Sequence, residues 1–368
     1  MTSVNAPRSD RADKKIYLGG AGGAPTNNVI KSLRVSGSEY LIGASSKPTD
    51  LFLADVNERY IVPPATSPGY QVALTNLLRR TKPDFLHFQH DLEIREISRF
   101  RDNLLHEGMK LYIPSAATIE VCVDKGRSYD IWQAAGLPVP KTIVVTSDDD
   151  LKRAFDTLGQ KIWLRATVGG GGKGALPTAD YEFARLWIDQ FDGWGRFTAA
   201  EMLTAQSVTW LSLWYEGELV VAQTRRRKSW SFGDRNLSGV TGITGVAETF
   251  SDPTVTRTAL DAISAIDRRP HGIFGVDMTY AEDGRPNPTE INIGRFFTTV
   301  HFFTEAGLNM PRIYVDIGLY GRFPAIPQKV NPLPDGLLWI RGMDTLPKLV
   351  TVEEFDRFVT EQTATGLV

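Results

Sequence analysis

The segment Phe274–Phe297 (FGVDMTYAEDGRPNPTEINIGRFF) constrains the fold of this chain more than any other stretch. Phe274–Tyr280 and Asn287–Ile293 read as two strands of a sheet. Between them, Ala281–Arg285 carries the Asp-Gly pair that is typical of a hairpin turn. The segment therefore predicts two antiparallel strands that pair across a short turn.

Three oxygen-bearing side chains fall on facing positions of this hairpin. Residues two apart on a strand point to the same face, so Glu290 and Asn292 project together, and pairing across the turn brings Asp277 beside them. Two carboxylates and an amide oxygen suit Mg²⁺ or Mn²⁺ that keeps phosphate and water ligands. Arg295 follows and could face a phosphate or a carboxylate. The alternative is an exposed hairpin with ordinary polar residues.

Length and composition set the broad class. A chain of 368 residues is expected to form two or three domains. Its 42% hydrophobic content is typical of a globular protein, and a net charge of −2 gives no reason to expect nucleic acid or a membrane as a partner. The N-terminus lacks the apolar core of a secretory signal, and no run is long enough to span a membrane. We therefore expect a cytoplasmic protein.

The first third of the chain predicts a parallel sheet. After a leader over residues 1–14 that we expect to be disordered, strands alternate with helices as far as Ile113, which indicates a doubly wound α/β domain. The loop Gly19–Gly23 lacks a clean G-x-G-x-x-G, so a nicotinamide-dependent oxidoreductase stays an alternative only. His90 follows the fourth expected strand, where open α/β sheets bind ligands, and is a candidate substrate contact.

A glycine-rich loop marks a second feature. The expected strand Lys161–Thr167 contains Arg165 and leads directly into Val168–Ala175, which holds four consecutive glycines and a lysine. Such a loop can bring backbone N–H groups and a cation close to phosphates, and we assign this role to a set of four residues, Gly170, Gly171, Gly172 and Lys173. A flexible linker is the alternative interpretation.

A basic run, Arg225–Lys228, precedes the glycine-spaced segment Ser229–Gly245, which we expect to be a loop. Four like charges in sequence repel one another unless an anion neutralises them. On a strand, Arg225 and Arg227 share one face, with Arg226 and Lys228 on the other. We favour Arg225 and Arg227 as contacts of an anionic substrate.

These features, in this order along the chain, resemble the ATP-grasp superfamily, nearest to the branch of biotin carboxylase and the carbamoyl-phosphate synthase large subunit. The resemblance covers about residues 15–322. Lys125, after Val123-Asp124, resembles the basic residue that opens the grasp module, and Arg165 with the glycine loop resembles its strand-end cation and phosphate lid. A further set, Glu201, Met202 and Leu203, resembles the hinge that binds adenine.

The resemblance implies a fold class of α/β plus α+β. It places a Rossmann-like parallel sheet, the pre-ATP-grasp domain, before a two-subdomain ATP-grasp module. The expected divisions are a leader at 1–14, the pre-ATP-grasp domain at 15–120, the small subdomain at 121–196, the large subdomain at 197–322 and a C-terminal extension at 323–368.

The resemblance also implies a function, with ATP and Mg²⁺ or Mn²⁺ as cofactors. The expected enzyme is a ligase that converts a carboxylate into an acyl phosphate and joins it to an amine, with small-molecule substrates and a homodimer as one expected assembly. Asp277, Glu290 and Asn292 fall where the metal ligands of the family fall, and Arg295 where a phosphate or acyl-phosphate arginine falls. A carbamate- or carboxyphosphate-forming enzyme is the alternative within the class, and a catalytically idle nucleotide-binding module is another.

The chain departs from the family after the adenine hinge. Many members carry an acidic residue there to hold the ribose, whereas this chain has Ala205-Gln206-Ser207-Val208. Asn292-Ile293-Gly294-Arg295 also stands in place of the usual Asn-Pro-Arg.

Overall fold

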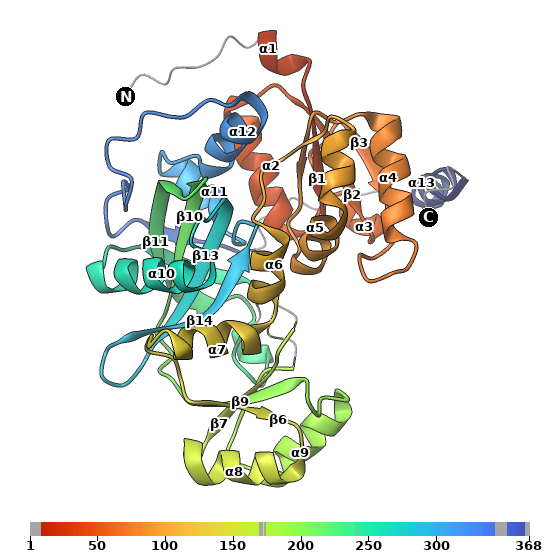
Figure 1. Cartoon of the computed structure of the whole chain (residues 1–368). Coiled ribbons are helices and arrows are strands. Elements are labelled where there is room, and N and C mark those ends of the chain that lie inside the picture. The colour runs from red at the N-terminus through yellow and green to blue at the C-terminus, as the bar shows by residue number, and fades with distance from the viewer. Residues whose placement is uncertain (1–8, 169–171, 173, 241, 343–351, 365–368) are drawn as a thin grey trace. The chain divides into compact units, whose positions relative to one another are not determined.

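The protein forms two compact units in a computed structural model that describes residues 9–168, 172, 174–240, 242–342 and 352–364 (Figure 1). Unit 1 draws its described residues from Met1–Ala116, Gly294–Pro327 and Met343–Val368. Unit 2 draws them from Ala117–Ile293 and Gln328–Gly342. The chain therefore returns to unit 1 at Gly294, directly after the predicted hairpin ends at Ile293.

Unit 1 is built on a five-stranded parallel sheet in the order β3-β2-β1-β4-β5. Its strands are β1 (Lys15–Gly19), β2 (Tyr40–Ser45), β3 (Glu58–Ile61), β4 (Phe85–His87) and β5 (Lys110–Leu111). Its helices are α1 (Ser9–Ala12), α2 (Ala24–Ser36), α3 (Pro48–Leu51), α4 (Tyr70–Thr81), α5 (Asp91–His106), α11 (Val300–Glu305), α12 (Met310–Tyr320) and α13 (Val352–Ala364). The alternating strands and helices confirm the predicted α/β domain.

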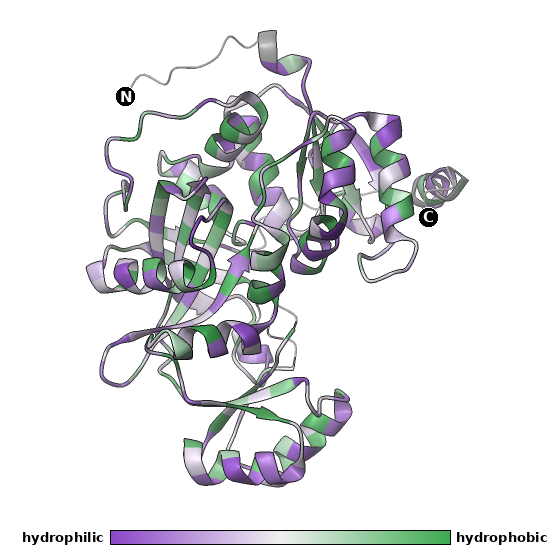
Figure 2. Ribbon diagram, viewed as in Figure 1, coloured by the Kyte–Doolittle hydropathy of each residue, from purple (hydrophilic) through white to green (hydrophobic). Residues whose placement is uncertain are grey.

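The central strands of this sheet are buried on both faces. Ile16, Tyr17 and Leu18 on β1 have no exposed surface. A parallel sheet covered by helices on both sides needs continuous apolar runs, which is why these strands read as uninterrupted hydrophobic segments. Figure 2 shows both colours along the helices that cover the sheet.

Residues 9–14, which the sequence places in the leader, include helix α1. The Arg11 guanidinium donates a hydrogen bond of 2.9 Å to Ser36 O and lies 3.3 Å from Asp316 of α12. Arg11 is 4% exposed, so these partners compensate for the loss of water around its charge. Residues 1–8 lie outside the described part of the chain.

Unit 2 contains two antiparallel sheets. One has six strands in the order β14-β13-β10-β11-β12-β15, and the other has four in the order β6-β9-β7-β8. The strands of the larger sheet are β10 (Ser207–Tyr215), β11 (Glu218–Trp230), β12 (Thr244–Thr249), β13 (Gly272–Tyr280), β14 (Pro286–Ile293) and β15 (Leu338–Ile340). Those of the smaller sheet are β6 (Thr142–Val145), β7 (Ile162–Ala166), β8 (Leu176–Thr178) and β9 (Phe197–Glu201).

Helices cover these sheets within unit 2. They are α6 (Ala116–Val123), α7 (Lys125–Ala134), α8 (Asp148–Leu158), α9 (Tyr181–Gln190) and α10 (Pro253–Ile266), with a short 3₁₀ helix, η1 (Gly233–Arg235). The Trp132 indole of α7 is 1% exposed and donates a hydrogen bond of 3.0 Å to Ala262 O of α10. Leu151 and Ile188, from α8 and α9, join the fully buried core of the small sheet.

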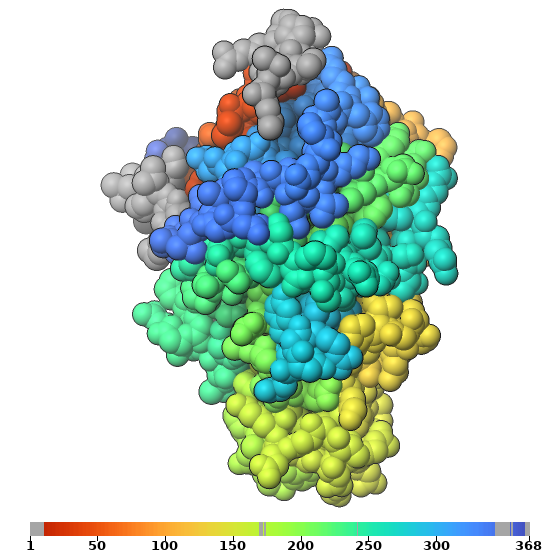
Figure 3. Space-filling model, turned by 90° about the vertical axis from the view of Figure 1, so that its left-hand side faces the viewer, coloured from red at the N-terminus to blue at the C-terminus, as the bar shows by residue number. Residues whose placement is uncertain are grey.

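The loop expected over Ser229–Gly245 is shorter than the sequence suggests. Strand β11 continues to Trp230, and β12 begins at Thr244 and pairs with both β11 and β15. The segment 328–342, which provides β15, is a blue strip across the green surface of unit 2 in Figure 3. The sequence does not reveal β12 for two reasons. Its surroundings, residues 229–245, are rich in glycine, and one of its partner strands, β15, lies far away in the sequence.

Within the described residues, none of the helices combines the length and apolar character that crossing a membrane requires.

Glu93 of α5 is a buried carboxyl group under the first glycine loop. It is 6% exposed, and the Tyr70 hydroxyl donates a hydrogen bond of 2.7 Å to its Oε1. Gly19 lets this carboxyl group approach the backbone, because a Cβ atom there would lie 2.4 Å from Glu93 Oε2 and would displace it. Burial raises the pKa of Glu93 from 4.5 to about 7, and the Tyr70 hydrogen bond opposes that shift.

This raised pKa makes the stability of the protein depend on pH. Below pH 4.5, Glu93 is protonated in both the folded and the unfolded chain, and the folded state keeps its full stability. As the pH rises to about 7, only the unfolded chain releases this proton readily, and the free energy of unfolding falls. Relative to wild type, Glu93→Gln should therefore be more stable at pH 8 than at pH 5, by about 2–3 kcal/mol in the free energy of unfolding. Urea titrations of the full chain at both pH values measure this difference. Glu96→Gln, on the same helix, is the control, and parallel pH profiles for wild type and Glu93→Gln would contradict the prediction.

Candidate active site

The candidate site is built on strands β13 and β14 of unit 2, which lie side by side (Figure 1). Asp277 and Glu290 are direct partners in this antiparallel pair, and Asn292 is the partner of Gly275. The Asn292 Nδ2 atom donates a hydrogen bond of 3.0 Å to Asp277 Oδ2. The structure thus brings together the three side chains that the sequence predicts as metal ligands, and their binding of a metal stays a prediction.

The cross-strand register extends the site into a row over four strands. Thr209 on β10 is the partner of both Arg225 on β11 and Asp277 on β13. Directly paired residues on neighbouring strands place their side chains on the same face. Arg225, Thr209, Asp277 and Glu290 therefore form one line across the sheet. The Thr209 hydroxyl, on a residue that is 1% exposed, donates a hydrogen bond to Asp277 Oδ1.

A β-bulge interrupts the ladder beside Asp277. Glu290 pairs with Asp277 and Pro288 with Met278, so Thr289 between them has no opposite residue. Such bulges leave backbone groups outside the ladder. The Arg165 guanidinium, from β7 of the smaller sheet, donates a hydrogen bond of 2.9 Å to Thr289 O. Burial lowers the pKa of Arg165, and the nearby Glu290 carboxylate opposes this effect.

Lys125 reaches the site from the start of helix α7. Asp124 caps this helix, because its Oδ1 accepts hydrogen bonds from Gly126 N at 2.9 Å and Arg127 N at 3.3 Å. The Lys125 backbone N–H donates to Thr167 O at 3.0 Å, which fixes the lysine next to the end of β7. Its Nζ atom lies 3.3 Å from Glu290 Oε2, and the lysine side chain is 11% exposed.

The basic run alternates between the two faces of β11. Arg226 and Lys228 pair with Glu248 on β12, at 2.8 Å and 3.4 Å, and keep 42% and 49% of their side chains exposed. Arg225 and Arg227 occupy the opposite face, where Arg227 NH2 lies 3.9 Å from Asp277 Oδ1. This is the alternation that the sequence predicts. The partner of the solvated pair, Glu248, could not be identified from the sequence.

A polar and aromatic shell holds Arg227. Its Nε and NH1 atoms donate hydrogen bonds of 3.1 Å to Thr244 Oγ1 and 2.9 Å to Ser207 Oγ, and its guanidinium carbon lies 3.7 Å from the centre of a Trp230 ring. Arg225 NH1 donates to the same Thr244 oxygen at 3.0 Å. One neutral hydroxyl therefore lies between two buried guanidinium groups.

The site has more positive than negative charge. Four cationic side chains, of Lys125, Arg165, Arg225 and Arg227, surround two carboxylates, of Asp277 and Glu290, in the contacts described above. Burial, followed by repulsion from Arg227, lowers the pKa of Arg225 to about 9, so this side chain still carries its charge at pH 7. Buried cations in excess of their partners favour the binding of an anion.

The glycine loop is described only in part. Gly170, Gly171 and Lys173 lie outside the described residues, so their predicted phosphate contacts stay predictions. Gly172 has a φ of 72° and approaches Val240 O so closely that a Cβ atom would lie 2.5 Å from it. Only glycine meets both constraints at this position.

The expected adenine hinge lies at the end of β9. Glu201 N donates to Lys141 O, and Glu201 Oε1 accepts from Lys141 N, both at 3.0 Å. Met202 and Leu203 follow the strand and are half-buried. These contacts hold the hinge in place, and its binding of adenine stays a prediction.

The remaining predicted site residues, Arg295 and His90, belong to unit 1. Arg295 forms a forked ion pair with Asp91, in which NH2 lies 3.0 Å from Asp91 Oδ2. His90 is exposed at the N-terminus of α5, whereas its neighbour Gln89 is buried and accepts a hydrogen bond of 2.8 Å from Phe296 N. Gln89 thus has a structural role, and the predicted ligand contact of His90 stays a prediction.

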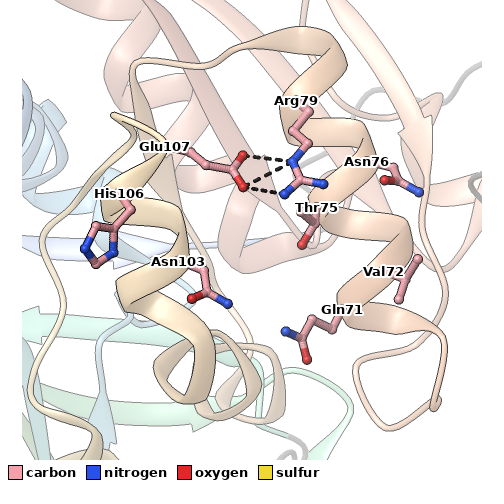
Figure 4. Close-up of a pocket in the computed structure, with 8 residues that line it drawn as sticks. All are labelled: Gln71, Val72, Thr75, Asn76, Arg79, Asn103, His106 and Glu107. Atoms are coloured by element: carbon pink, nitrogen blue, oxygen red, sulfur yellow. Dashed lines mark hydrogen bonds and ion pairs between the residues drawn. The ribbon is translucent and has the colours of Figure 1, made fainter.

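Unit 1 also has a surface pocket of about 490 Å³ between α4 and α5 (Figure 4). Its lining is mostly polar and includes Gln71, Asn76 and Asn103, and the Arg79–Glu107 ion pair of 2.7 Å joins the two helices. The Arg79 side chain is 61% exposed. None of the predicted site residues lines this pocket.

The donor set of the hairpin fits a hard cation. Asp277, Glu290 and Asn292 offer oxygen atoms only, which is the preference of Mg²⁺. Among the described residues, no three His, Cys, Asp or Glu side chains gather as a metal site. A cation here would therefore depend on the Asn292 amide and on oxygens from phosphate or water. This is how Mg²⁺ is held when it accompanies a nucleotide.

Sequence reasoning missed Thr209, Thr244 and Ser207, which contact the charged groups of the site. Each is a small hydroxyl residue on a strand, and such residues are common in sheets without any function. The period of two along β10 was the one available signal, since Ser207 and Thr209 lie on the same face.

Comparison with known proteins supports the fold. No family model matches the chain. Over 83 residues, it is 35% identical to a pyruvate carboxylase subunit of Methanothermobacter thermautotrophicus, and this match spans 22% of the chain and 17% of that protein's length.

Solved structures of several enzymes match over most of the chain, and three of them illustrate the likeness. The biotin carboxylase domain dimer of the Hydrogenobacter thermophilus 2-oxoglutarate carboxylase, in complex with MgADP, ADP and bicarbonate, matches with a TM-score of 0.66 and 17% identity, over 88% of this chain and 73% of that one. N5-carboxyaminoimidazole synthetase of Staphylococcus aureus, complexed with ADP, has a TM-score of 0.64 and 16% identity over 89% and 81%. The L-amino acid ligase of Bacillus licheniformis has a TM-score of 0.63 and 13% identity over 83% and 74%.

Proposed function

From the ATP-grasp fold that these likenesses establish, we propose that the protein is an ATP- and Mg²⁺-dependent ligase that joins a carboxylate to an amine. The observation that carries the proposal is the cross-strand cluster of Asp277, Glu290 and Asn292, with Lys125 and Arg165 beside it. The carboxylate and amide oxygens can hold the cation that accompanies a nucleoside triphosphate. The cationic side chains beside them can bind its phosphates.

Each residue of the cluster has a role in this proposal. Asp277, Glu290 and Asn292 would hold Mg²⁺, which supplies neutralisation of charge on the phosphates. Lys125 and Arg165 bind the phosphate oxygens and stabilise the negative charge that spreads over them during transfer. Arg165 is well placed for this, because the bulge at Thr289 fixes its side chain while part of its guanidinium remains available for other contacts.

The reaction has two steps. A carboxylate oxygen of the acid attacks the γ-phosphorus of ATP, the bond from γ-phosphorus to the bridging oxygen breaks, and an acyl phosphate and ADP form. The lone pair of the amine nitrogen then attacks the carbonyl carbon, phosphate leaves with the electrons of the C–O bond, and the nitrogen releases a proton to solvent or to phosphate. Because phosphate is a good leaving group, the second step needs no nucleophilic side chain of the protein.

Arg225 and Arg227 are the proposed contacts of the acid. Both lie on the face of β11 that is directed at Asp277, and both are withdrawn from water. Arg227 already uses Nε and NH1 for Thr244 and Ser207. We therefore assign the binding of the carboxylate to Arg225 and Arg227 together.

Bicarbonate is a second candidate for the acid. The Hydrogenobacter thermophilus domain is in complex with MgADP and bicarbonate, and its fold covers 88% of this chain. With bicarbonate, the first step would form carboxyphosphate and the product would be a carbamate.

We also propose a cytoplasmic location, where ATP is available, and a homodimer, by analogy with the Hydrogenobacter thermophilus domain dimer.

Trapping with hydroxylamine tests the proposal. The protein is incubated with ATP, Mg²⁺, hydroxylamine and a library of carboxylic acids, and hydroxamates are detected by mass together with ADP. A separate reaction with bicarbonate and no organic acid is followed by ADP formation alone. We expect one acid, or bicarbonate, to stimulate ADP release at least tenfold. Absence of stimulated ADP release both across the library and with bicarbonate would overturn the proposed reaction and favour a nucleotide-binding module.

Glu290→Gln tests the metal cluster. Replacing the carboxylate with an amide removes one negative charge that would hold Mg²⁺, so we expect acid-dependent ADP formation to fall by about 100-fold or more. Glu282→Gln, in the turn of the same hairpin, is the matched control and should retain wild-type activity. Near wild-type turnover of Glu290→Gln at saturating Mg²⁺ would show that Glu290 is not a ligand.

Arg225→Met tests the anchor for the acid. Loss of this buried guanidinium should raise the Michaelis constant for the acid by about 10- to 100-fold, because a charge-assisted contact is removed, and leave that for ATP within about threefold. Arg226→Met, the adjacent residue on the solvated face, should leave both constants unchanged. Equal increases for acid and ATP in Arg225→Met would assign Arg225 to the nucleotide instead.

A further inference from the structure

We infer that Thr209 is a positioning residue for the metal-binding carboxylate of Asp277, an inference that rests on the proposed role of Asp277 in holding Mg²⁺. Thr209 lies on β10 between the two strands that carry opposite charges of the site. Its cross-strand partners are Arg225 on one side and Asp277 on the other. Its hydroxyl donates to Asp277 Oδ1 rather than to a backbone carbonyl.

The Asp277 carboxylate is fixed from three directions. Oδ1 accepts the Thr209 hydroxyl and lies 3.9 Å from Arg227 NH2, and Oδ2 accepts Asn292 Nδ2 at 3.0 Å. A carboxylate has about four lone-pair positions, so these donors leave sites for a cation while they determine the plane of the group. Groups that orient a ligand in this way contribute to metal affinity without touching the metal.

Thr209 also competes with the arginines of β11 for the Asp277 carboxylate. Arg225 and Arg227 lie on the β11 side of Asp277, and opposite charges that are withdrawn from water attract strongly. Without the Thr209 hydroxyl, the carboxylate would turn toward these guanidinium groups and away from Glu290 and Asn292. Thr209 therefore keeps the carboxylate directed at the other two ligands.

Glu290 is held in a different way from Asp277. Its ion pair with Lys125, at 3.3 Å, joins two long side chains, and the Glu290 side chain is 30% exposed, compared with 18% for Asp277. Two flexible side chains restrain each other less than a short hydroxyl on a paired strand does. The Thr209 hydroxyl therefore restrains Asp277 more than the Lys125 ion pair restrains Glu290.

The test measures the dependence on the cation in Thr209→Val, Thr209→Ala and Thr209→Ser. We expect valine and alanine to raise the Mg²⁺ concentration for half-maximal ADP formation by about 10- to 100-fold, and serine to stay within about threefold of wild type. The same order should appear when binding of Mn²⁺ to the protein with ADP is followed by electron paramagnetic resonance. Rescue by serine and a shift in cation dependence are effects that a general loss of stability does not produce.

Ser212→Ala is the matched control. Ser212 also lies on β10 and is buried, and its hydroxyl donates a hydrogen bond of 3.0 Å to Phe274 O on β13. Because it is three residues from Thr209, its side chain lies on the opposite face of the strand. We expect Ser212→Ala to lower the melting temperature as much as the Thr209 variants do and to leave the cation dependence unchanged.

The outcomes separate this inference from the proposed function. Two results would overturn the role of Thr209. In the first, Thr209→Val and Thr209→Ala have the same cation dependence as wild type. In the second, Thr209→Ser and Ser212→Ala show the same shift in cation dependence as the valine and alanine variants. If wild type forms no acid-dependent ADP, the proposed reaction fails, and the Mn²⁺ titration still decides whether Thr209 positions Asp277. Weak binding of Mn²⁺ by Thr209→Val and normal binding by Thr209→Ser in that titration would support the inference on their own.

Discussion

The antiparallel pairing of β13 with β14 is the interaction on which the candidate site depends. Its register sets Asp277 opposite Glu290 and leaves Asn292 within hydrogen-bond distance of Asp277. A slip by one residue would turn every side chain of β14 to the other face of the sheet. The bulge at Thr289 adds a backbone carbonyl for Arg165 at the same place. One strand pair thus fixes the carboxylates and the strand-end cation together.

Neighbouring strands then bring charge to this pair in a regular way. The alternation along β11 turns Arg225 and Arg227 toward the carboxylates and Arg226 toward Glu248. On the face with Glu248, the basic side chains are 42% and 49% exposed, and ion pairs of such exposed groups contribute little to stability. The face with Asp277 is buried, so its excess of positive charge is costly until an anion is bound. This cost is the physical basis of the proposal that the site binds an anion.

The fold and the ordered set of motifs were accessible from the sequence. The alternation of strands with helices indicated the parallel sheet of unit 1, and the Asp-Gly turn indicated the hairpin of unit 2. Strand β12 and its pairing with β15 were not accessible, because the partner residues are about 90 positions apart and the segment between β11 and β12 is rich in glycine. Short strands that are completed by distant segments have no local signal.

The sequence alone determined which side chains share a strand face, because the period of two is a property of the backbone. It therefore placed Glu290 with Asn292, and Arg225 with Arg227, without reference to the rest of the fold. The tertiary structure alone decided which face is buried and which partner each charge meets: Thr209 for Asp277, Thr244 for both arginines, and Asp91 for Arg295. These partners come from separate elements, and the register and packing that join them arise only when the chain folds.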